Sequence, residues 1–116
     1  MGSITKTIRY NIVFEMPISL PFPIQSRCIS LINLGRMMNL FSINMFMHVM
    51  DVYNRLMSNE LWIYDLQDLQ RLCDEIVKNE AINNYLREDI KELFQILDLF
   101  IKVSYTPVRP CGLWSQ

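Results

Sequence analysis

The stretch LWIYDLQDLQRLCDEIV, residues 61–77, limits the folds open to this chain more than any other part of the sequence. Its first four residues are bulky and apolar without a break, which is typical of a strand that is buried on both faces. Beyond them the apolar residues recur at the spacing of an amphipathic helix, at Leu66, Leu69, Leu72, Cys73 and Ile76. We therefore predict a strand over 61–64 that runs directly into a helix, with Asp65 as the N-cap of that helix.

Two more strands and two more helices are predicted from the rest of the chain. The alternating stretch TIRYNIVFE (7–15) predicts a first strand, and GRMMNLF (35–41) predicts a second. Between them, the three prolines of MPISLPFPIQ (16–25) predict a loop. Apolar residues at helical spacing then predict a helix that begins after Ser42, its expected N-cap, and a last helix that carries Tyr85 through Phe100.

These elements predict an α+β fold, a small antiparallel sheet of three or four strands with three amphipathic helices on one face. One domain would span 1–104, followed by an irregular tail at 105–116. The helices can cover only one face of the sheet, so a second copy of the chain is the expected cover of the other face. The predicted homodimer interface consists of Tyr10, Ile12, Phe14, Leu61, Trp62, Ile63 and Tyr64.

Composition narrows the classes of function. Of 116 residues, 51% are hydrophobic, enough for a single folded domain, and the formal net charge of −1 provides no basic field for direct nucleic-acid binding. Residues 1–15 lack the apolar run of a signal peptide, and the longest apolar stretch is interrupted by Arg36, His48 and Asp51, so we expect no membrane span. Three cysteines without paired spacing indicate reduced thiols in an intracellular protein.

The chain offers little for catalysis or for binding a metal or cofactor. His48 is the single histidine, and the three cysteines lie far apart in the sequence, so no ligand spacing that suits zinc is present. The sequence contains no glycine-rich phosphate-binding loop and no nucleophile motif. We therefore predict a protein that is not an enzyme and binds no metal or cofactor.

A set of short motifs resembles the enhancer of rudimentary homologue family over residues 8–97. The matching stretches are Gly35-Arg36, Ser42-Ile43-Asn44, Val49 with Tyr53, Trp62-Ile63-Tyr64-Asp65 and Asp89-Ile90-Lys91-Glu92. The resemblance implies a sheet-to-sheet homodimer that acts as a non-enzymatic adaptor, in the nucleus or in cytoplasmic RNA granules. Such an adaptor would hold short peptide segments of RNA-processing and gene-silencing proteins. The chain departs from the family in its proline-rich segment and in a shorter link before the last helix, which leaves a fourth strand open.

A second stretch, NLGRMMNLFS (33–42), resembles the BH1 segment of Bcl-2 proteins, in which N-W-G-R precedes an apolar helix. Leu34 stands where that motif has tryptophan, and the 32 residues before Asn33 read as strand and loop rather than as the helices that family needs. This resemblance implies the alternative function, a groove-binding regulator of apoptosis with an all-helical fold.

The helix after Ser42 carries more apolar surface than one buried stripe requires. Adjacent residues on a helix point about 100° apart, so Met45 and Phe46 cannot both lie at the centre of one stripe. Flexible methionines suit a surface that adapts to a peptide, although burial of both sides of the helix in a dimer would explain the same composition. The predicted peptide-binding residues are Met45, Phe46, Val49, Met50 and Tyr53.

Overall fold

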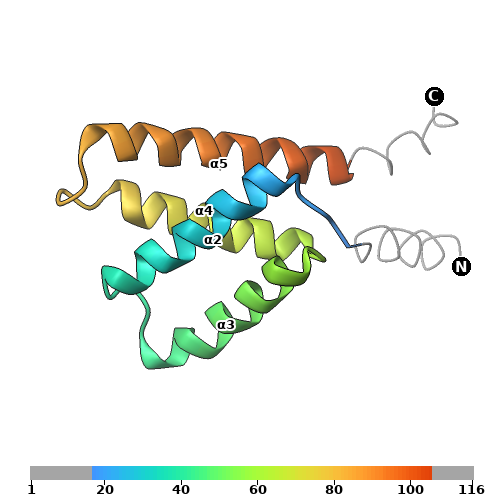
Figure 1. Cartoon of the computed structure of the whole chain (residues 1–116), viewed down its shortest axis with the longest axis horizontal. Helices are drawn as coiled ribbons and strands as arrows, with labels where there is room; N and C mark the ends of the chain where they lie inside the picture. The colour runs from blue at the N-terminus through green and yellow to red at the C-terminus, as the bar shows by residue number, and fades with distance from the viewer. Residues whose placement is uncertain (1–16, 106–116) are drawn as a thin grey trace, which may run out of the picture.

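The computed structural model describes residues 17–105, and the regular secondary structure of this part is entirely helical (Figure 1). The helices are α2 (Phe22–Met37), α3 (Ile43–Ser58), α4 (Ile63–Val77) and α5 (Asn84–Tyr105). The predicted α+β fold with an antiparallel sheet is therefore wrong for the described residues. The predicted strand at 7–15 lies outside them.

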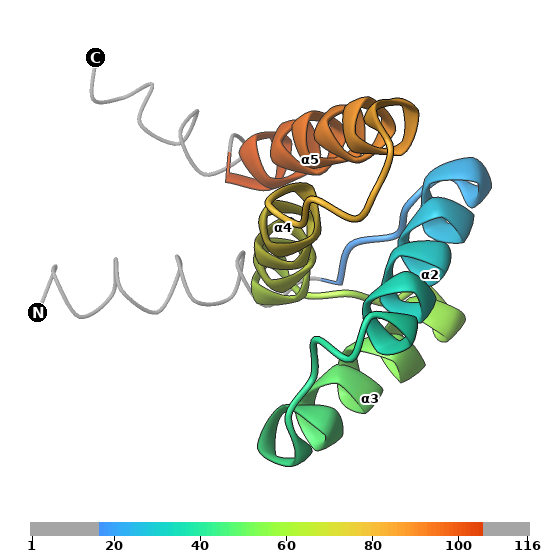
Figure 2. The ribbon, with the colours of Figure 1, turned by 90° about the vertical axis from the view of Figure 1, so that its left-hand side faces the viewer.

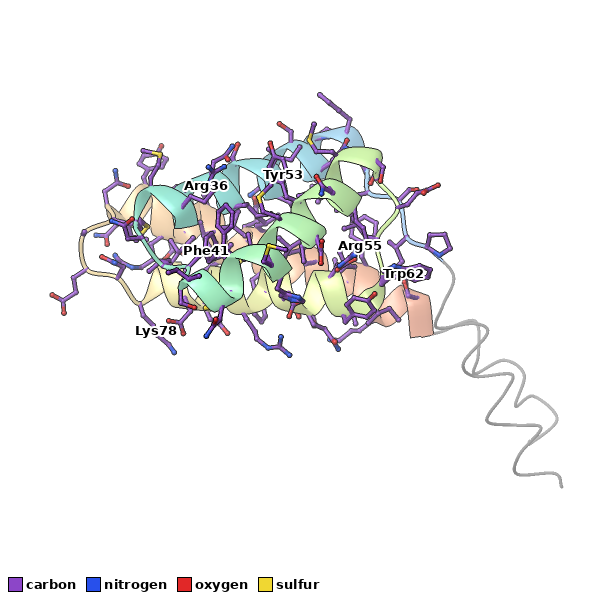
Figure 3. The ribbon with its side chains drawn as sticks, turned by 90° about the horizontal axis from the view of Figure 1, so that it is seen from below. Arg36, Phe41, Tyr53, Arg55, Trp62 and Lys78 are labelled. Atoms are coloured by element: carbon purple, nitrogen blue, oxygen red, sulfur yellow. The ribbon has the colours of Figure 1, made fainter. Side chains whose placement is uncertain are left out.

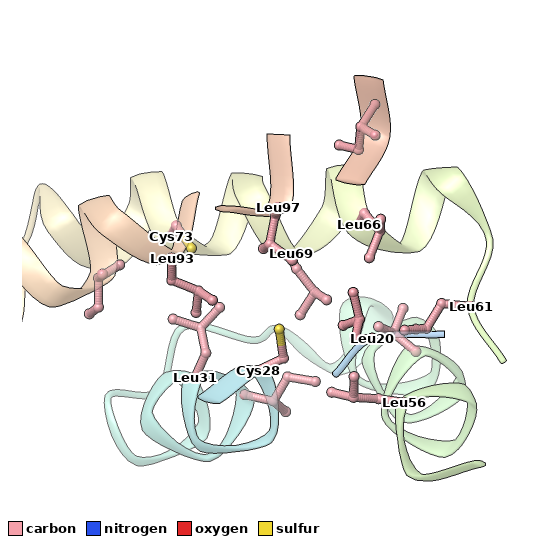
Figure 4. Packing of buried hydrophobic residues seen from close by; sticks show 14 of the residues in the cluster. Leu20, Cys28, Leu31, Leu56, Leu61, Leu66, Leu69, Cys73, Leu93 and Leu97 are labelled. Carbon is pink, nitrogen blue, oxygen red and sulfur yellow. The ribbon is translucent and has the colours of Figure 1, made fainter. Parts of the chain in front are cut away.

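Helix α4 lies at the centre of the arrangement. Helix α5 packs along one side of α4, α2 packs on a neighbouring side and reaches α5 through Arg27, and α3 packs mainly on α2 (Figure 2). The core therefore collects side chains from both sides of α4, among them Leu31 and Cys28 from α2 and Leu93 and Leu97 from α5 (Figure 4). Because α4 is covered on two sides within one chain, its apolar residues need no second copy to bury them.

The start of α4 explains why the apolar residues 61–64 lead into a helix without a loop. Leu61 forms an isolated antiparallel bridge with Ile18, and the helix has already begun at Ile63. Leu61 and Ile63 are buried in the core of the chain, whereas Tyr64 is half-exposed. The predicted strand over 61–64 is thus wrong, because an apolar row this short fits a buried first helical turn as well as a strand.

Four residues of the predicted dimer interface, 61–64, lie in the described part of the chain, and none of them is in a sheet. Leu61 and Ile63 are covered by their own chain, and the described residues contain no sheet on which a sheet-to-sheet dimer could form. Trp62 is half-buried at the N-cap position of α4. The remaining predicted interface residues, Tyr10, Ile12 and Phe14, lie outside the described part of the chain.

Helix α2 begins inside the segment that the prolines predicted as a loop. Pro21 occupies the N-cap position and Pro23 lies in the first turn. The N–H groups of a first turn have no partner within the helix, so a proline there removes no hydrogen bond. The loop prediction fails because it counted prolines without regard to their position relative to a helix start.

The end of α2 replaces the second predicted strand. Gly35 is buried in the last turns of α2, and a Cβ atom at this position would lie 2.7 Å from the Phe41 ring. The chain reverses at Asn39, whose φ is 57°, and the N–H of Leu40 donates to the carbonyl of Gly35 at 3.0 Å. The prediction of a strand over 35–41 is therefore wrong: the glycine lets the connection fold back closely onto α2.

The three predicted helices are present. Ser42 is the N-cap of α3, and its Oγ accepts a hydrogen bond from the N–H of Met45 at 3.2 Å, as predicted. In α4 the N-cap is Trp62, and Asp65 is the third helical residue, so the predicted cap is wrong by three positions. In α5 the buried residues include Ile90, Leu93 and Leu97, while Tyr85, predicted on the apolar face, is 90% exposed.

Candidate functional site

An apolar groove of about 640 Å³ opens between α3 and α4. Its floor comes from α2 and the connection that follows, through Ile32, Leu40 and Phe41. The α3 wall presents Met45, Val49 and Val52, and the α4 wall presents Leu69 and Leu72. Figure 3 shows this side of the molecule, with Phe41 near the start of α3 and Lys78 at the far end of α4.

The two walls meet where α3 is joined to α4 by residues 59–62. Asn59, at the C-cap of α3, has a φ of 57° and turns the chain. Its side-chain amide donates to the carbonyl of Leu20 and accepts from the N–H of Leu20, both at 2.8 Å. These contacts join the segment before α2 to the α3–α4 corner.

An ion pair with a buried carboxylate holds the same corner. The Arg55 guanidinium donates to both carboxylate oxygens of Asp65, each at 2.9 Å, and Asp65 also accepts the N–H of Trp62 at 2.9 Å. Asp65 has no exposed surface, and its hydrogen bond raises the pKa of Arg55. Arg55 also lies 5.7 Å from the centre of the Tyr64 ring. Because both partners are bonded in a fixed geometry, α3 and α4 diverge from a rigid corner.

A second, more exposed contact between α3 and α4 spans the mouth of the groove. His48 on α3 and Asp68 on α4 approach to 2.6 Å between Nε2 and Oδ2, and the other oxygen of Asp68 contacts Arg71. The Asp68 side chain is 22% exposed and that of His48 is 56% exposed. This contact therefore lies where solvent meets the apolar walls, and we call it the mouth clasp.

The rest of the polar rim belongs to α4. Glu75 approaches Lys78 at 3.6 Å, and both side chains are mostly exposed. Asp74 lies on the same rim and is also exposed. The groove thus has an uncharged floor, a largely apolar α3 wall and a charged α4 edge.

Of the residues predicted to bind a peptide, the structure places two in the groove. Met45 and Val49 line its α3 wall. Phe46 is 41% exposed, and neither it nor Met50 is part of the groove lining. Tyr53 packs against the core instead.

Sequence reasoning missed the other parts of the site. Phe41 and Leu72 were assigned to a strand and to a buried helix face, and Asp68 looks like any polar residue of an amphipathic helix. The stretch that resembles BH1 does reach the site, since it forms the end of α2 and the connection, and its Leu40 and Phe41 lie on the groove floor.

The His48–Asp68 pair has the form of a base with an orienting carboxylate, but the groove lining contains no serine, threonine or cysteine to act as a nucleophile. Within residues 17–105, no group of three or more metal-ligating side chains lies close enough to hold an ion. No described helix is long and apolar enough to cross a membrane.

Comparisons of the chain with protein-family models, with curated proteins and with solved structures find no match. The two resemblances seen in the sequence therefore rest on the quoted residues alone.

Proposed function

We propose that this protein is a non-enzymatic interaction module that binds a helical segment of a partner protein in the groove between α3 and α4. The observation that carries the proposal is the groove itself, which combines an apolar floor with a charged rim. Its volume of about 640 Å³ falls in the range of roughly 300–1,000 Å³ that is usual for ligand sites.

The geometry favours a helix as the ligand. The groove is bounded by two helices that diverge from a fixed corner and has a floor of large apolar side chains such as Leu40 and Phe41. An amphipathic helix laid in such a groove presents apolar side chains at spacings of three, four and seven residues to the floor. Met45, at the mouth and 47% exposed, is flexible enough to adapt to them.

The helical fold also bears on the two resemblances. The RNA-processing adaptor function was implied together with an antiparallel sheet, which the described residues lack. The BH1-like stretch implied groove binding in an all-helical protein, and it contributes to the groove floor here. These observations favour the class of groove binder over that of sheet-paired adaptor, and they leave the cellular process served by the partner to experiment.

Two variants of the same helix test the proposal. Met45 lines the groove, whereas Met47 is 73% exposed and not part of the lining. Met45→Lys and Met47→Lys are each compared with the wild type by circular dichroism, and partners are then captured from cell extract and quantified by mass spectrometry. We expect Met45→Lys to lose partners that Met47→Lys keeps. Equal capture by both variants would contradict the proposal.

A further inference from the structure

We propose that Asp68 anchors a lysine or arginine side chain of the bound segment, so that the ligand is a basic amphipathic helix of a separate protein. This inference rests on the proposed function, because it specifies which helix the groove selects. It starts from the position of Asp68, which is 22% exposed, whereas the other charged side chains of the α4 rim are mostly exposed.

In the free protein the Asp68 carboxylate has a partner on each oxygen, Arg71 on Oδ1 and His48 on Oδ2. Its carboxylate lies beside the apolar wall formed by Leu69 and Leu72, where an unpaired charge would be costly. In the free protein His48 supplies the partner from the opposite wall, at 2.6 Å. A helix that enters between α3 and α4 meets this mouth clasp first, and a cationic side chain on the helix replaces His48 at the Oδ2 atom.

The second partner of Asp68 does not compete with this exchange. Arg71 contacts the other carboxylate oxygen, and its side chain is 74% exposed on the solvent side of α4. Exposed pairs between residues three apart on one helix are weak. Asp68 can thus keep Arg71 on Oδ1 and accept a ligand cation on Oδ2, which is the arrangement that His48 now occupies.

The charge on the rim favours the same ligand. Among the lining residues, α4 contributes three carboxylates, Asp68, Asp74 and Glu75, against two cations, Arg71 and Lys78, which leaves a charge of −1 on this edge. The floor is uncharged, and on the α3 wall His48 is the only titratable lining residue. A helix with one apolar face and basic residues along one edge is complementary to this distribution, and a helix with an acidic edge is not.

The spacing of two carboxylates along α4 sets the spacing of basic residues that we expect on the ligand. Asp68 and Glu75 are seven residues apart, which corresponds to about 10 Å along a helix. Two basic residues seven apart on the ligand would reach both carboxylates. The Glu75–Lys78 contact of 3.6 Å is exposed and yields readily to such a residue.

The test is a display library of 16-residue amphipathic helices with fixed leucines on one face. Four edge positions are randomised among lysine, arginine, glutamine and glutamate. The full chain is used as bait in four forms: wild type, Asp68→Asn, Asp51→Asn and Met45→Lys. Asp51 is the matched control, since it is an exposed aspartate of α3 outside the groove lining. Circular dichroism establishes that each bait is folded.

We expect the wild type and Asp51→Asn to enrich lysine and arginine at the edge positions, and Asp68→Asn to lose that preference while still selecting leucine-faced helices. In titrations with matched synthetic peptides, the lysine peptide should bind the wild type about tenfold more tightly than the glutamine peptide, and Asp68→Asn about equally. Equal enrichment of glutamine, or enrichment of glutamate, would overturn the role of Asp68 but not the groove. Failure to enrich any helix whose binding depends on Met45 would overturn the proposed function as well.

Two other occupants are distinguished in the same experiment. A synthetic peptide of residues 4–16 tests whether the chain's own N-terminal segment, which contains Lys6 and Arg9, fills the groove. Light scattering with and without a selected peptide tests whether a second copy does. Binding of the 4–16 peptide as tightly as the selected ones, or a dimer that the peptide dissociates, would overturn the assignment to a separate protein.

Discussion

Arg55 and Asp65 form a two-bond ion pair between α3 and α4, with both N–O distances at 2.9 Å, although Asp65 has no exposed surface. The pair lies at the corner from which the walls of the groove diverge. Each carboxylate oxygen is satisfied, since the backbone of Trp62 also donates to Asp65. The angle between the two walls therefore depends on a contact whose carboxylate is buried and whose guanidinium is 29% exposed.

Removal of Arg55 should destabilise the fold strongly. Arg55→Met leaves the carboxylate of Asp65 buried without its cation, a change that typically costs about 3–5 kcal/mol. Urea denaturation measures the loss of unfolding free energy. Arg71→Met is the control, since Arg71 is 74% exposed, and it should change stability by no more than about 0.5 kcal/mol. Similar losses in both variants would show that the corner does not depend on the buried pair.

The mouth clasp should contribute far less to stability than the corner. His48 is 56% exposed, and an exposed polar contact of this kind contributes roughly 0–1 kcal/mol. We therefore expect His48→Gln to lower the unfolding free energy by less than about 1 kcal/mol. A loss as large as that of Arg55→Met would mean that the clasp is part of the fold and unavailable for exchange with a ligand.

Gly35 should be intolerant of even a methyl group. An alanine Cβ would lie 2.7 Å from the Phe41 ring and 3.2 Å from Leu72, so Phe41 must move. Overpacking of this kind costs about 1–3 kcal/mol, whereas Gly→Ala in an unconstrained helix stabilises by about 1 kcal/mol. Thermal unfolding should show a lower Tm for Gly35→Ala and partial recovery in Gly35→Ala with Phe41→Leu. A higher Tm for the single variant would contradict the close packing of Phe41 on α2.

The two buried cysteines, Cys28 and Cys73, should not react with thiol reagents in the folded protein. Burial raises the pKa of Cys28 and of Cys73 to about 12, so at pH 8 only about one thiol in 10⁴ is the reactive thiolate. Because Cys111 lies outside the described residues, the measurement uses Cys111→Ser and a chromogenic disulfide reagent. No thiol should react at pH 8 without denaturant, and two should react in urea. Rapid reaction of the folded protein would show that the core around α2 and α4 is open.

The sequence predicts three of the four described helices and misses α2. Helix α3 with its Ser42 cap and most of α4 and α5 follow from apolar periodicity, which is a local property. The row 61–64 was misread because its apolar character arises from packing against Ile18 and the rest of the core, a contact 43 positions away that periodicity does not contain. Helix α2 was not predicted because its prolines were taken to exclude a helix. Proline is in fact common in the first turn of a helix, where Pro23 lies.

The candidate site was predictable only in part, for the same reason. Met45 and Val49 were identified from the excess apolar surface of their own helix. Asp68 and Phe41 acquire their roles when α4 and the α2–α3 connection come together with α3. A carboxylate on the polar side of one helix looks solvated in sequence, and its partial burial at the mouth is set by the neighbouring helix.

The claim that the groove between α3 and α4 binds a helix is tested most directly by NMR of the chain with ¹³C-labelled methionine methyl groups. The labelled full chain is titrated with a leucine-faced helical peptide with a basic edge. Met45 lines the groove, while Met47 and Met57 are 73% and 55% exposed and lie outside the lining. We predict that the methyl signal of Met45, assigned with Met45→Leu, shifts on titration while those of Met47 and Met57 stay in place. Shifts confined to Met47 and Met57, or saturation of binding with no change at Met45, would contradict the account.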